Sequence, residues 1–452
     1  MTTFIIRFLS LLFVSAAAVQ ASSKPFPRGI IDLPGATSAK SPIGTLTDHP
    51  WLNPNIDGVR IRTGWNNTET GDNVFNWAQI DECLANASAS GKFIGLGIIS
   101  GFDAPAWLLG GVTFTDGTST LDVATVTSPT AAFVSSDVGK VIASDNYSPG
   151  TRIVSVTSST VAKTSAAATK TSTTKKPAVF SILARKTGGA AFWVLSDLKG
   201  VMPVPWDPIF KAKWKEFIVA LAARYDSNPQ LGYQVMAGFQ QTGECYLAAA
   251  PEDIAFFDSS AVAAGYKATD LLPAGLVAWE ATVKEIVAQY MTSFKDTPLL
   301  ITGARPYGGD QLVAGQRAMN DIFDWGFATY PGRFGVMNSQ LHVTSSAGYY
   351  LNAAIVNNNA TVPTGLQFIC NSMTDDNVAR LSNATPYGSD QLLSAYNAMD
   401  ASFNAGVSLG AGYIEVYEAD VNNVAYQSML GQKREALGVT TPRAPTNLRI
   451  VP

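Results

Sequence analysis

The stretch that decides the fold is Leu231-Gly-Tyr-Gln-Val-Met-Ala-Gly-Phe239, which is followed a few residues later by Glu244. A short apolar run of this kind, bounded by loop residues, is typical of a buried strand. Apolar side chains at helical spacing precede it from Phe210 to Tyr225, which predicts an amphipathic helix there. The order helix, buried strand, loop places Glu244 just beyond the end of a strand in a parallel sheet.

The same alternation of strand-like and helix-like segments continues along most of the chain, with a further predicted helix at Leu392 to Ala405. The predicted strands lie at 29–33, 58–63, 93–99, 231–239, 298–303, 333–342, 365–371 and 411–417. Strands alternating with helices in this number predict a closed, parallel (β/α)8 barrel of the TIM type. We expect residues 22–111 and 184–440 to form this barrel.

The segment 112–183 has a different composition, rich in Thr, Ser, Val and Ala and without helical periodicity. Short alternating runs such as Arg152-Ile-Val-Ser-Val156 recur between turn residues. This pattern predicts a small all-β domain inserted into the barrel. The insertion resembles β modules of phage-tail and other surface proteins.

The two ends of the chain differ from the rest. Arg7, the apolar run Phe8 to Val19 and a small-residue site ending at Ala21 predict a cleaved signal peptide over residues 1–21. This run is shorter than the ~20 residues of a membrane-spanning helix, so the sequence predicts a secreted or periplasmic protein without a membrane span. Residues 441–452 form a proline-rich tail that we expect to pack on the barrel.

The charge balance bounds the class of partner. The formal net charge is −4, and no run of like charges predicts binding to nucleic acid. We therefore expect a neutral substrate. Two histidines, His49 and His342, and three scattered cysteines do not form a metal-ligand pattern, and no cofactor fingerprint is present. We expect the cysteines to be buried thiols, with a disulfide between Cys245 and Cys370 as the alternative.

Several motifs resemble the large clan of retaining (β/α)8 glycoside hydrolases, particularly its β-galactosidase-like members. These are Val59-Arg-Ile-Arg-Thr-Gly-Trp65, Glu69, Phe75-Asn-Trp77, Phe93-Ile-Gly-Leu-Gly-Ile-Ile99 and Ala104-Pro-Ala-Trp-Leu108. The resemblance implies hydrolysis of O-glycosidic bonds in a poly- or oligosaccharide, with Glu244 as the catalytic acid/base and Glu69 in a structural role. Gly243 precedes Glu244, where the clan usually has Asn.

A second carboxylate is required for such hydrolysis. The seventh predicted strand has no acid before Asp375, whereas the eighth has two glutamates. Side chains alternate along a strand, so Glu415 shares one face with Tyr417, and we expect this face to point into the barrel. We prefer Glu415 as the nucleophile and keep Glu418 as the alternate; the competing interpretation of Glu415 is a buried carboxylate held by Arg60 or Arg62.

Sugar sites combine aromatic platforms with polar groups that bind hydroxyls. We expect Trp65, Trp107 and above all Trp206 to act as platforms, and Trp77 and Trp214 to belong to the core. The predicted polar contacts to substrate are Gln240, His342, Gln367 and Tyr417.

Two other functions remain open. The Gly before Glu244 and the seventh strand without an acid are compatible with a non-catalytic carbohydrate-binding or surface protein on a degenerate barrel. The insertion alone suggests a virion-associated protein. Two facing carboxyl groups in the barrel mouth would favour the enzyme.

Overall fold

The computed structural model describes residues 23–34, 50–197 and 199–439. The predicted signal peptide and the predicted C-terminal tail lie outside these residues. Among the described residues, no helix combines the length and the apolar character needed to cross a membrane.

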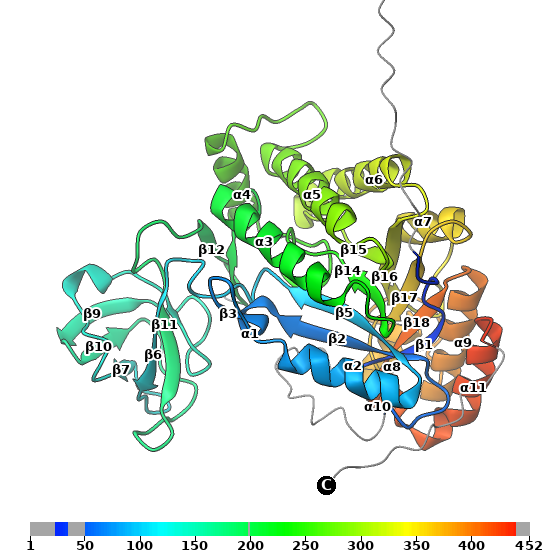
Figure 1. Cartoon of the computed structure of the whole chain (residues 1–452), viewed down its shortest axis with the longest axis horizontal. Coiled ribbons are helices and arrows are strands. Elements are labelled where there is room, and N and C mark those ends of the chain that lie inside the picture. The colour runs from blue at the N-terminus through cyan, green and yellow to red at the C-terminus, as the bar shows by residue number, and fades with distance from the viewer. Residues whose placement is uncertain (1–22, 35–49, 198, 440–452) are drawn as a thin grey trace, which may run out of the picture.

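A closed parallel barrel is the centre of the molecule (Figure 1), as the sequence predicts. Its strands, in the order in which they close the barrel, are β1 (Gly29–Leu33), β18 (Tyr413–Tyr417), β17 (Thr364–Phe368), β16 (Phe334–Leu341), β15 (Leu299–Gly303), β14 (Leu231–Val235), β5 (Phe93–Ile99) and β2 (Gly58–Gly64). All eight predicted strands are confirmed. Each neighbouring pair is parallel, including β1 with β18, which completes the closure.

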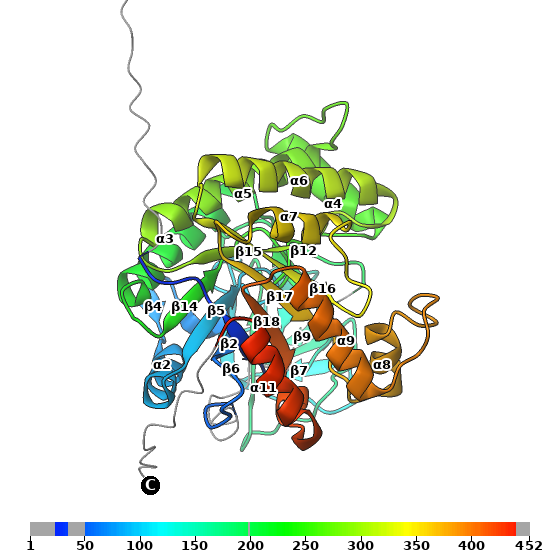
Figure 2. The same cartoon turned by 90° about the vertical axis from the view of Figure 1, so that its right-hand side faces the viewer.

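Helices surround this sheet, as the view turned by 90° shows (Figure 2). They are α1 (Trp65–Thr68), α2 (Ala78–Ser90), α3 (Pro208–Tyr225), α4 (Pro251–Ala263), α5 (Ala274–Ser293), α6 (Leu312–Thr329), α7 (Tyr350–Asn358), α8 (Asp375–Leu381), α9 (Ala395–Ser408), α10 (Glu418–Val421) and α11 (Gln427–Ala436). Both predicted helices are present as α3 and α9. Their first residues are set by capping side chains, because Asp207 and Ser394 accept hydrogen bonds from backbone N–H groups of the first turn.

The interior of the barrel and the layer beneath the helices form separate packing regions. Inside the barrel lie Ile31, Tyr233, Val235, Leu300, Met337 and Tyr413, all buried. Between the sheet and the helices, the fully buried side chains include Trp65, Trp214 and Trp279. Alternation along each strand separates the two regions, so the position of a residue in its strand decides which region it joins.

The inserted segment forms two three-stranded antiparallel sheets to one side of the barrel (Figure 1). One contains β7 (Thr125–Thr127), β10 (Val161–Thr164) and β9 (Ile153–Ser158); the other contains β6 (Val112–Gly117), β11 (Ala178–Ile182) and β8 (Ile142–Ala143). These strands enclose their own apolar cluster around Phe133, Ile153 and Phe180. None of them joins the barrel sheet. Two short hairpins, β3 (Glu69–Gly71) with β4 (Val74–Phe75) and β12 (Phe192–Val194) with β13 (Val201–Pro203), complete the strands.

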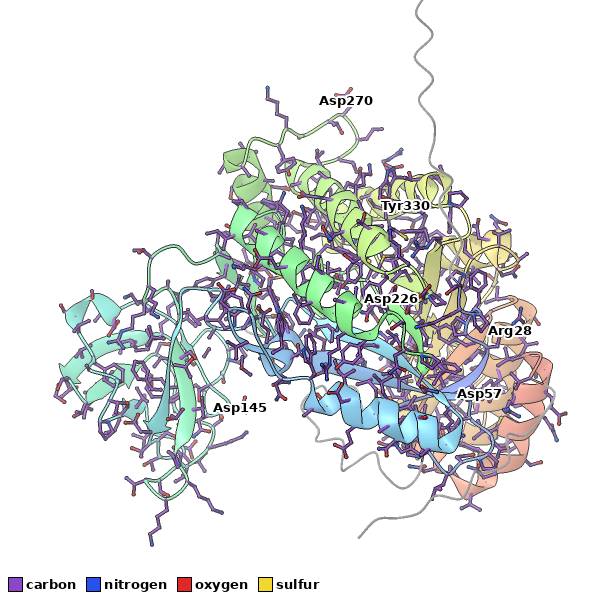
Figure 3. All side chains as sticks on the ribbon, in the orientation of Figure 1. Arg28, Asp57, Asp145, Asp226, Asp270 and Tyr330 are labelled. Carbon is purple, nitrogen blue, oxygen red and sulfur yellow. The ribbon has the colours of Figure 1, made fainter. Side chains whose placement is uncertain are left out.

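Carboxylates at the amino-terminal end of the barrel stabilise the chain connections. Asp57 and Asp226, labelled in Figure 3, precede β2 and β14. Asp57 forms an ion pair with Arg434 of α11 at 2.7 Å. Asp226 accepts hydrogen bonds from the backbone N–H groups of residues 295–297, just before β15. Both carboxylates are therefore bound to structural partners at this end of the barrel. The opposite end is the one available for chemistry.

Candidate active site

Polar side chains from several strands converge at the mouth, the open end of the barrel at the carboxyl ends of its strands. We call Arg62 of β2, Ser339 of β16, Gln367 of β17, Tyr417 of β18 and the loop residue Glu244 the mouth cluster. The Ser339 hydroxyl donates a hydrogen bond to Glu244 Oε1, and Gln367 Nε2 donates to the Tyr417 hydroxyl at 3.5 Å. The charge of Glu244 acts on both Arg62 and Tyr417. The cluster thus surrounds one partly exposed carboxylate.

The loop after β14 holds Glu244 against the neighbouring strand. The predicted strand 231–239 ends early, at Val235, because the chain turns at Gly238, whose φ of +116° favours glycine. The backbone N–H of Cys245 then donates to the carbonyl of Thr302 on β15 at 3.0 Å. Glu244 therefore projects from a loop that is anchored to β15, rather than from the end of β14.

Gln240, predicted to contact substrate, instead holds this loop. Its side chain is buried, accepts a hydrogen bond from the backbone N–H of Phe239 at 3.1 Å and donates to the carbonyl of Met236 at 3.4 Å. Both ends of the amide are engaged with backbone groups, so the side chain has no surface for a sugar. The prediction for Gln240 is wrong, because sequence position does not reveal which loop side chains serve the turn itself.

Glu415 points into the barrel, as strand alternation predicts, and has no exposed surface. Arg60 Nη1 lies 3.1 Å from Glu415 Oε1, and the Tyr233 hydroxyl donates to the same oxygen at 2.6 Å. Glu415 Oε2 has no hydrogen bond to any described residue. Burial would lower the pKa of Arg60, but the Glu415 carboxylate together with Tyr233 and Tyr413 outweighs burial and raises it. This arrangement matches the competing interpretation of Glu415, a buried carboxylate held by an arginine. The sequence did not decide between that interpretation and a nucleophile.

Glu418 directly follows the last residue of β18. It begins α10, and its charge raises the pKa of Asp32, second to the effect of burial. Asp32 follows Ile31, which faces the barrel interior, so the Asp32 side chain faces outward. The position of Glu418 beside Asp32 therefore speaks against its predicted role as the alternate nucleophile.

Asp32 itself was not among the predicted functional residues. It is fully buried in β1, and neither carboxylate oxygen has a hydrogen bond in the described part of the chain. Burial raises its pKa well above the ordinary range. An acid inside the apolar run Gly29-Ile-Ile-Asp-Leu33 is the sequence signal that could have drawn attention to it.

Two of the three predicted aromatic platforms are buried. Trp65 is fully buried, packs edge-on against Trp214 with 4.9 Å between ring centroids, and donates to Glu69 Oε2 at 2.7 Å. Trp206 is 3% exposed and donates to the Ser260 hydroxyl at 3.2 Å. Neither ring has a face available to a sugar, so both predictions are wrong. The reason is that residues flanking strand ends also fill the layer beneath the helices.

Trp107 is only partly buried, and it donates from Nε1 to the carbonyl of Glu69 at 3.2 Å. It remains a candidate platform. Glu69, which also accepts hydrogen bonds from Trp65 and from the backbone N–H of Asn73, has the structural contacts that the resemblance implies.

His342 follows the last residue of β16 and is partly buried. Burial lowers its pKa, an effect that Asp390 partly offsets, so the ring is neutral at neutral pH. Its Nδ1 lies 3.2 Å from the Thr344 hydroxyl. These contacts lie in the loop after β16, and within the part of the chain that the structure describes no hydrogen bond joins His342 to Glu244.

The described residues contain no group of three or more His, Cys, Asp or Glu side chains arranged to hold a metal ion. Cys83, Cys245 and Cys370 are all buried and free, as the sequence predicts.

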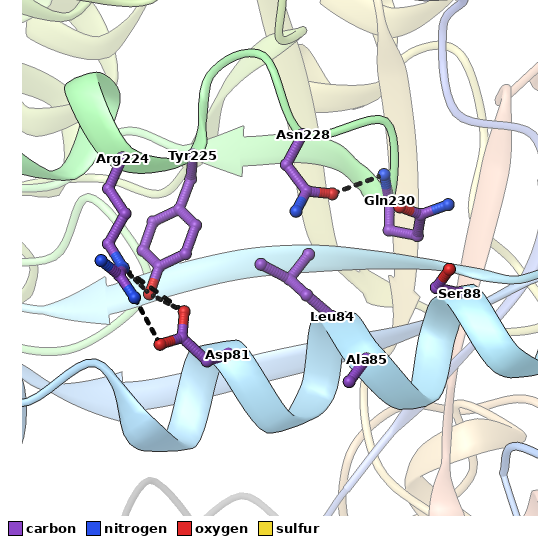
Figure 4. Close-up of a pocket in the computed structure, with 8 residues that line it drawn as sticks. All are labelled: Asp81, Leu84, Ala85, Ser88, Arg224, Tyr225, Asn228 and Gln230. Carbon is purple, nitrogen blue, oxygen red and sulfur yellow. Dashed lines mark hydrogen bonds and ion pairs between the residues drawn. The ribbon is translucent and has the colours of Figure 1, made fainter.

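A shallow polar pocket of about 400 Å³ lies outside the barrel, between α2, the end of α3 and the segment before β14 (Figure 4). In it, Arg224 bonds to Asp81 at 2.6 Å and to the Tyr225 hydroxyl at 3.1 Å. Nε and Nη2 of Arg224 are thus engaged with neighbouring side chains, and the pocket shares no residue with the mouth cluster.

Known protein families and curated proteins give no match to this sequence. Among solved structures, the catalytic domain of β-amylase from Paenibacillus polymyxa is similar, with 8% identity, a TM-score of 0.48, and 93% of this chain and 100% of that chain covered. A β-galactosidase from Bacillus circulans has 11% identity, a TM-score of 0.43, and coverage of 87% and 50%. A psychrophilic family 10 endo-β-1,4-xylanase has 9% identity, a TM-score of 0.38, and coverage of 86% and 85%. Similarity this remote does not establish an activity for this chain. The activity is inferred from the geometry of the site.

Proposed function

We propose that this protein is a glycoside hydrolase in which Glu244 transfers the proton to and from the glycosidic oxygen. The observation that carries the proposal is the partly exposed Glu244 carboxylate at the mouth of a closed (β/α)8 barrel, with Arg62, Ser339, Gln367 and Tyr417 around it. Catalytic groups of such barrels lie at this end, because loops from every strand meet there.

The surroundings of Glu244 suit proton transfer. Ser339 holds one carboxyl oxygen, which leaves the other to donate a proton to the leaving oxygen of the sugar. The Tyr417 hydroxyl and the Gln367 amide supply donors and acceptors for sugar hydroxyl groups. The predicted signal peptide supports an exported enzyme that meets its carbohydrate outside the cytoplasm.

The second carboxylate of the reaction is assigned to Glu415 in this proposal. A retaining mechanism requires it to approach the anomeric carbon, ~5 to 5.5 Å from the acid/base, whereas inversion leaves ~6.5 to 9.5 Å for a water molecule. Arg60 and Tyr233 both bind Oε1 of Glu415, so Oε2 is the oxygen left to attack. Glu415 has no exposed surface, so the side chains that cover it have to move before a sugar can reach Oε2.

A second candidate function is carbohydrate binding without hydrolysis. Two observations favour it: Gln367, an amide, is the inward residue near the end of β17, and Glu415 has no exposed surface. A barrel with one accessible carboxylate would bind a sugar without cleaving it.

The test is a Glu244→Gln variant assayed on a panel of oligosaccharides. We expect hydrolysis to fall roughly 10²- to 10⁴-fold, the usual contribution of a general acid, with binding of the best substrate retained because the amide preserves the shape. The matched control is Glu216→Gln, at an exposed ion pair with Lys213. Equal turnover of Glu244→Gln and the wild type would overturn the assignment, and sugar binding without hydrolysis by the wild type would support the second function.

A further inference from the structure

Arg62 uses few of its five N–H donors in hydrogen bonds to described residues. Its one hydrogen bond to a described residue runs from Nη2 to the carbonyl of Pro34 at 3.2 Å. The side chain is only partly buried, so its other guanidinium nitrogens keep access to solvent. Arg224, in the pocket of Figure 4, instead forms hydrogen bonds to both oxygens of Asp81 and to Tyr225.

The charges around Arg62 do not provide a dedicated counter-ion. Burial lowers the pKa of Arg62, and the neighbouring Arg60 lowers it further, while Glu415 and Glu244 act in the opposite direction. The Glu415 carboxylate already forms the ion pair with Arg60. Glu244 accepts the hydrogen bond of the Ser339 hydroxyl and forms no ion pair with Arg62 among the described residues.

A partly buried cation without its own anion can bind an anionic group that a ligand supplies. A guanidinium presents several donors in one plane, which match the two oxygens of a carboxylate. Because the side chain of Arg62 lies in the mouth cluster, a ligand bound there would bring its anionic group next to the sugar ring that Glu244 approaches.

We propose that Arg62 is a specificity-determining residue that binds the anionic group of an acidic sugar, the carboxylate of a uronic acid residue. The inference rests on the mouth cluster as the sugar site. It replaces the expectation of a neutral substrate, which came from the net charge of the whole chain. Exposed side chains dominate that net charge, whereas the ligand responds to the few charges within the mouth.

The experiment measures binding by calorimetry for three matched pairs of trisaccharides: galacturonate and galactose, glucuronate and glucose, mannuronate and mannose. We expect the wild type to bind the acidic member of at least one pair about 10-fold or more tightly than its neutral partner, the effect of one hydrogen bond to a charged group. Arg62→Gln should lose this preference. Arg62→Lys should recover part of it, because the charge remains without the planar fork.

Arg224→Gln is the matched control, and it should keep the preference of the wild type. Circular dichroism shows whether each variant is folded. If Arg62→Gln does not fold, Arg62→Lys still allows the comparison with the wild type. The proposal is overturned if no pair shows a preference for the acidic member, or if Arg62→Gln keeps it. Tighter binding of a sulfated trisaccharide than of every uronate would overturn the carboxylate assignment.

The outcome is separate from that of the proposed hydrolysis. Loss of turnover in Glu244→Gln on neutral sugars, with no acidic preference, would support the hydrolase and reject the role of Arg62. An acidic preference that depends on Arg62, in a protein that hydrolyses nothing, would do the reverse.

Discussion

Single residues inside the barrel lie at two levels with different access to solvent. Glu415 is fully buried with Arg60 and Tyr233, whereas Glu244 and Arg62 lie at the mouth. A charge in the lower level depends on its partner, because water cannot replace that partner. A charge at the mouth can exchange protons or ligands, as catalysis requires.

The first prediction at this scale concerns the buried ion pair. Glu415→Gln should lower the free energy of unfolding by about 3–5 kcal/mol, because it leaves Arg60 as an uncompensated buried charge. Urea denaturation measures the change. Glu216→Gln, at an exposed pair, should stay within about 0.5 kcal/mol of the wild type. A Glu415→Gln protein as stable as this control would show that the pair does not stabilise the barrel.

The second prediction concerns Asp32. Burial, with a smaller contribution from Glu418, raises its pKa in the folded state above the unfolded value of about 3.9. Above that pH the unfolded chain loses the proton while the folded chain keeps it, so stability falls as pH rises toward the folded pKa. Below the unfolded pKa, both states carry the proton and the stability from Asp32 is fully present.

We therefore expect Asp32→Asn to become increasingly more stable than the wild type as pH rises from about 4, with a difference that grows by up to about 1.4 kcal/mol per pH unit. Thermal unfolding between pH 4 and pH 8 measures this. Asp420, whose pKa burial raises to about 6, should leave both proteins with a shared decline between about pH 4 and pH 6. Parallel pH profiles for the two proteins would mean that Asp32 is charged in the fold.

At the scale of elements, small residues on one strand make room for large residues on the next. Gly95 of β5 faces Tyr233 of β14, and a Cβ at this position would lie 1.9 Å from Tyr233 Cζ. Likewise, a Cβ at Gly365 of β17 would lie 2.1 Å from Tyr413 Cζ. The glycines in these strands thus allow the tyrosine layer that surrounds Glu415.

Gly95→Ala should cost about 1–3 kcal/mol, the usual effect of an extra carbon in a packed core, and should displace the Tyr233 hydroxyl from Glu415. Differential scanning calorimetry gives the stability, and tyrosine absorbance reports the displaced hydroxyl. The matched control is Gly243→Ala, since a Cβ there would meet no atom within 4 Å. If both variants unfold at the wild-type temperature, the contact between Gly95 and Tyr233 is not tight.

At the scale of the whole molecule, the barrel and the insertion have separate apolar cores. The strands that join them are paired, with Val112 directly opposite Ile182 in an antiparallel ladder. The insertion gives Val141 to the main core, and Arg185 donates hydrogen bonds to carbonyls of Ala131 and Ala132. The folding of the barrel therefore depends on few contacts with the insertion.

A variant in which a two-residue turn replaces residues 113–181 should fold, because the paired ends suit a hairpin. We expect a single cooperative unfolding transition and a loss of about 2–3 kcal/mol, mainly from Val141. Circular dichroism and calorimetry measure both. An unfolded or aggregated product would show that the barrel requires the insertion.

The sequence by itself determined the architecture of this protein. Local patterns of apolar and polar residues predict the eight strands, the helices at 210–225 and 392–405 and the change of composition at 112–183. Each pattern lies within a single segment of the chain. Strand alternation also predicted that Glu415 points inward. Each of these inferences needs only neighbours along the chain.

Only the tertiary structure decided the composition of the candidate site. Whether Trp65 and Trp206 are exposed depends on side chains far away in the sequence, as does the engagement of Glu415 by Arg60 and Tyr233. The pairing of Glu244 with Ser339 depends on a loop that crosses to the next strand. Burial and charge balance are sums over residues that meet only when the barrel closes, and for this reason the sequence could name candidates but not their partners.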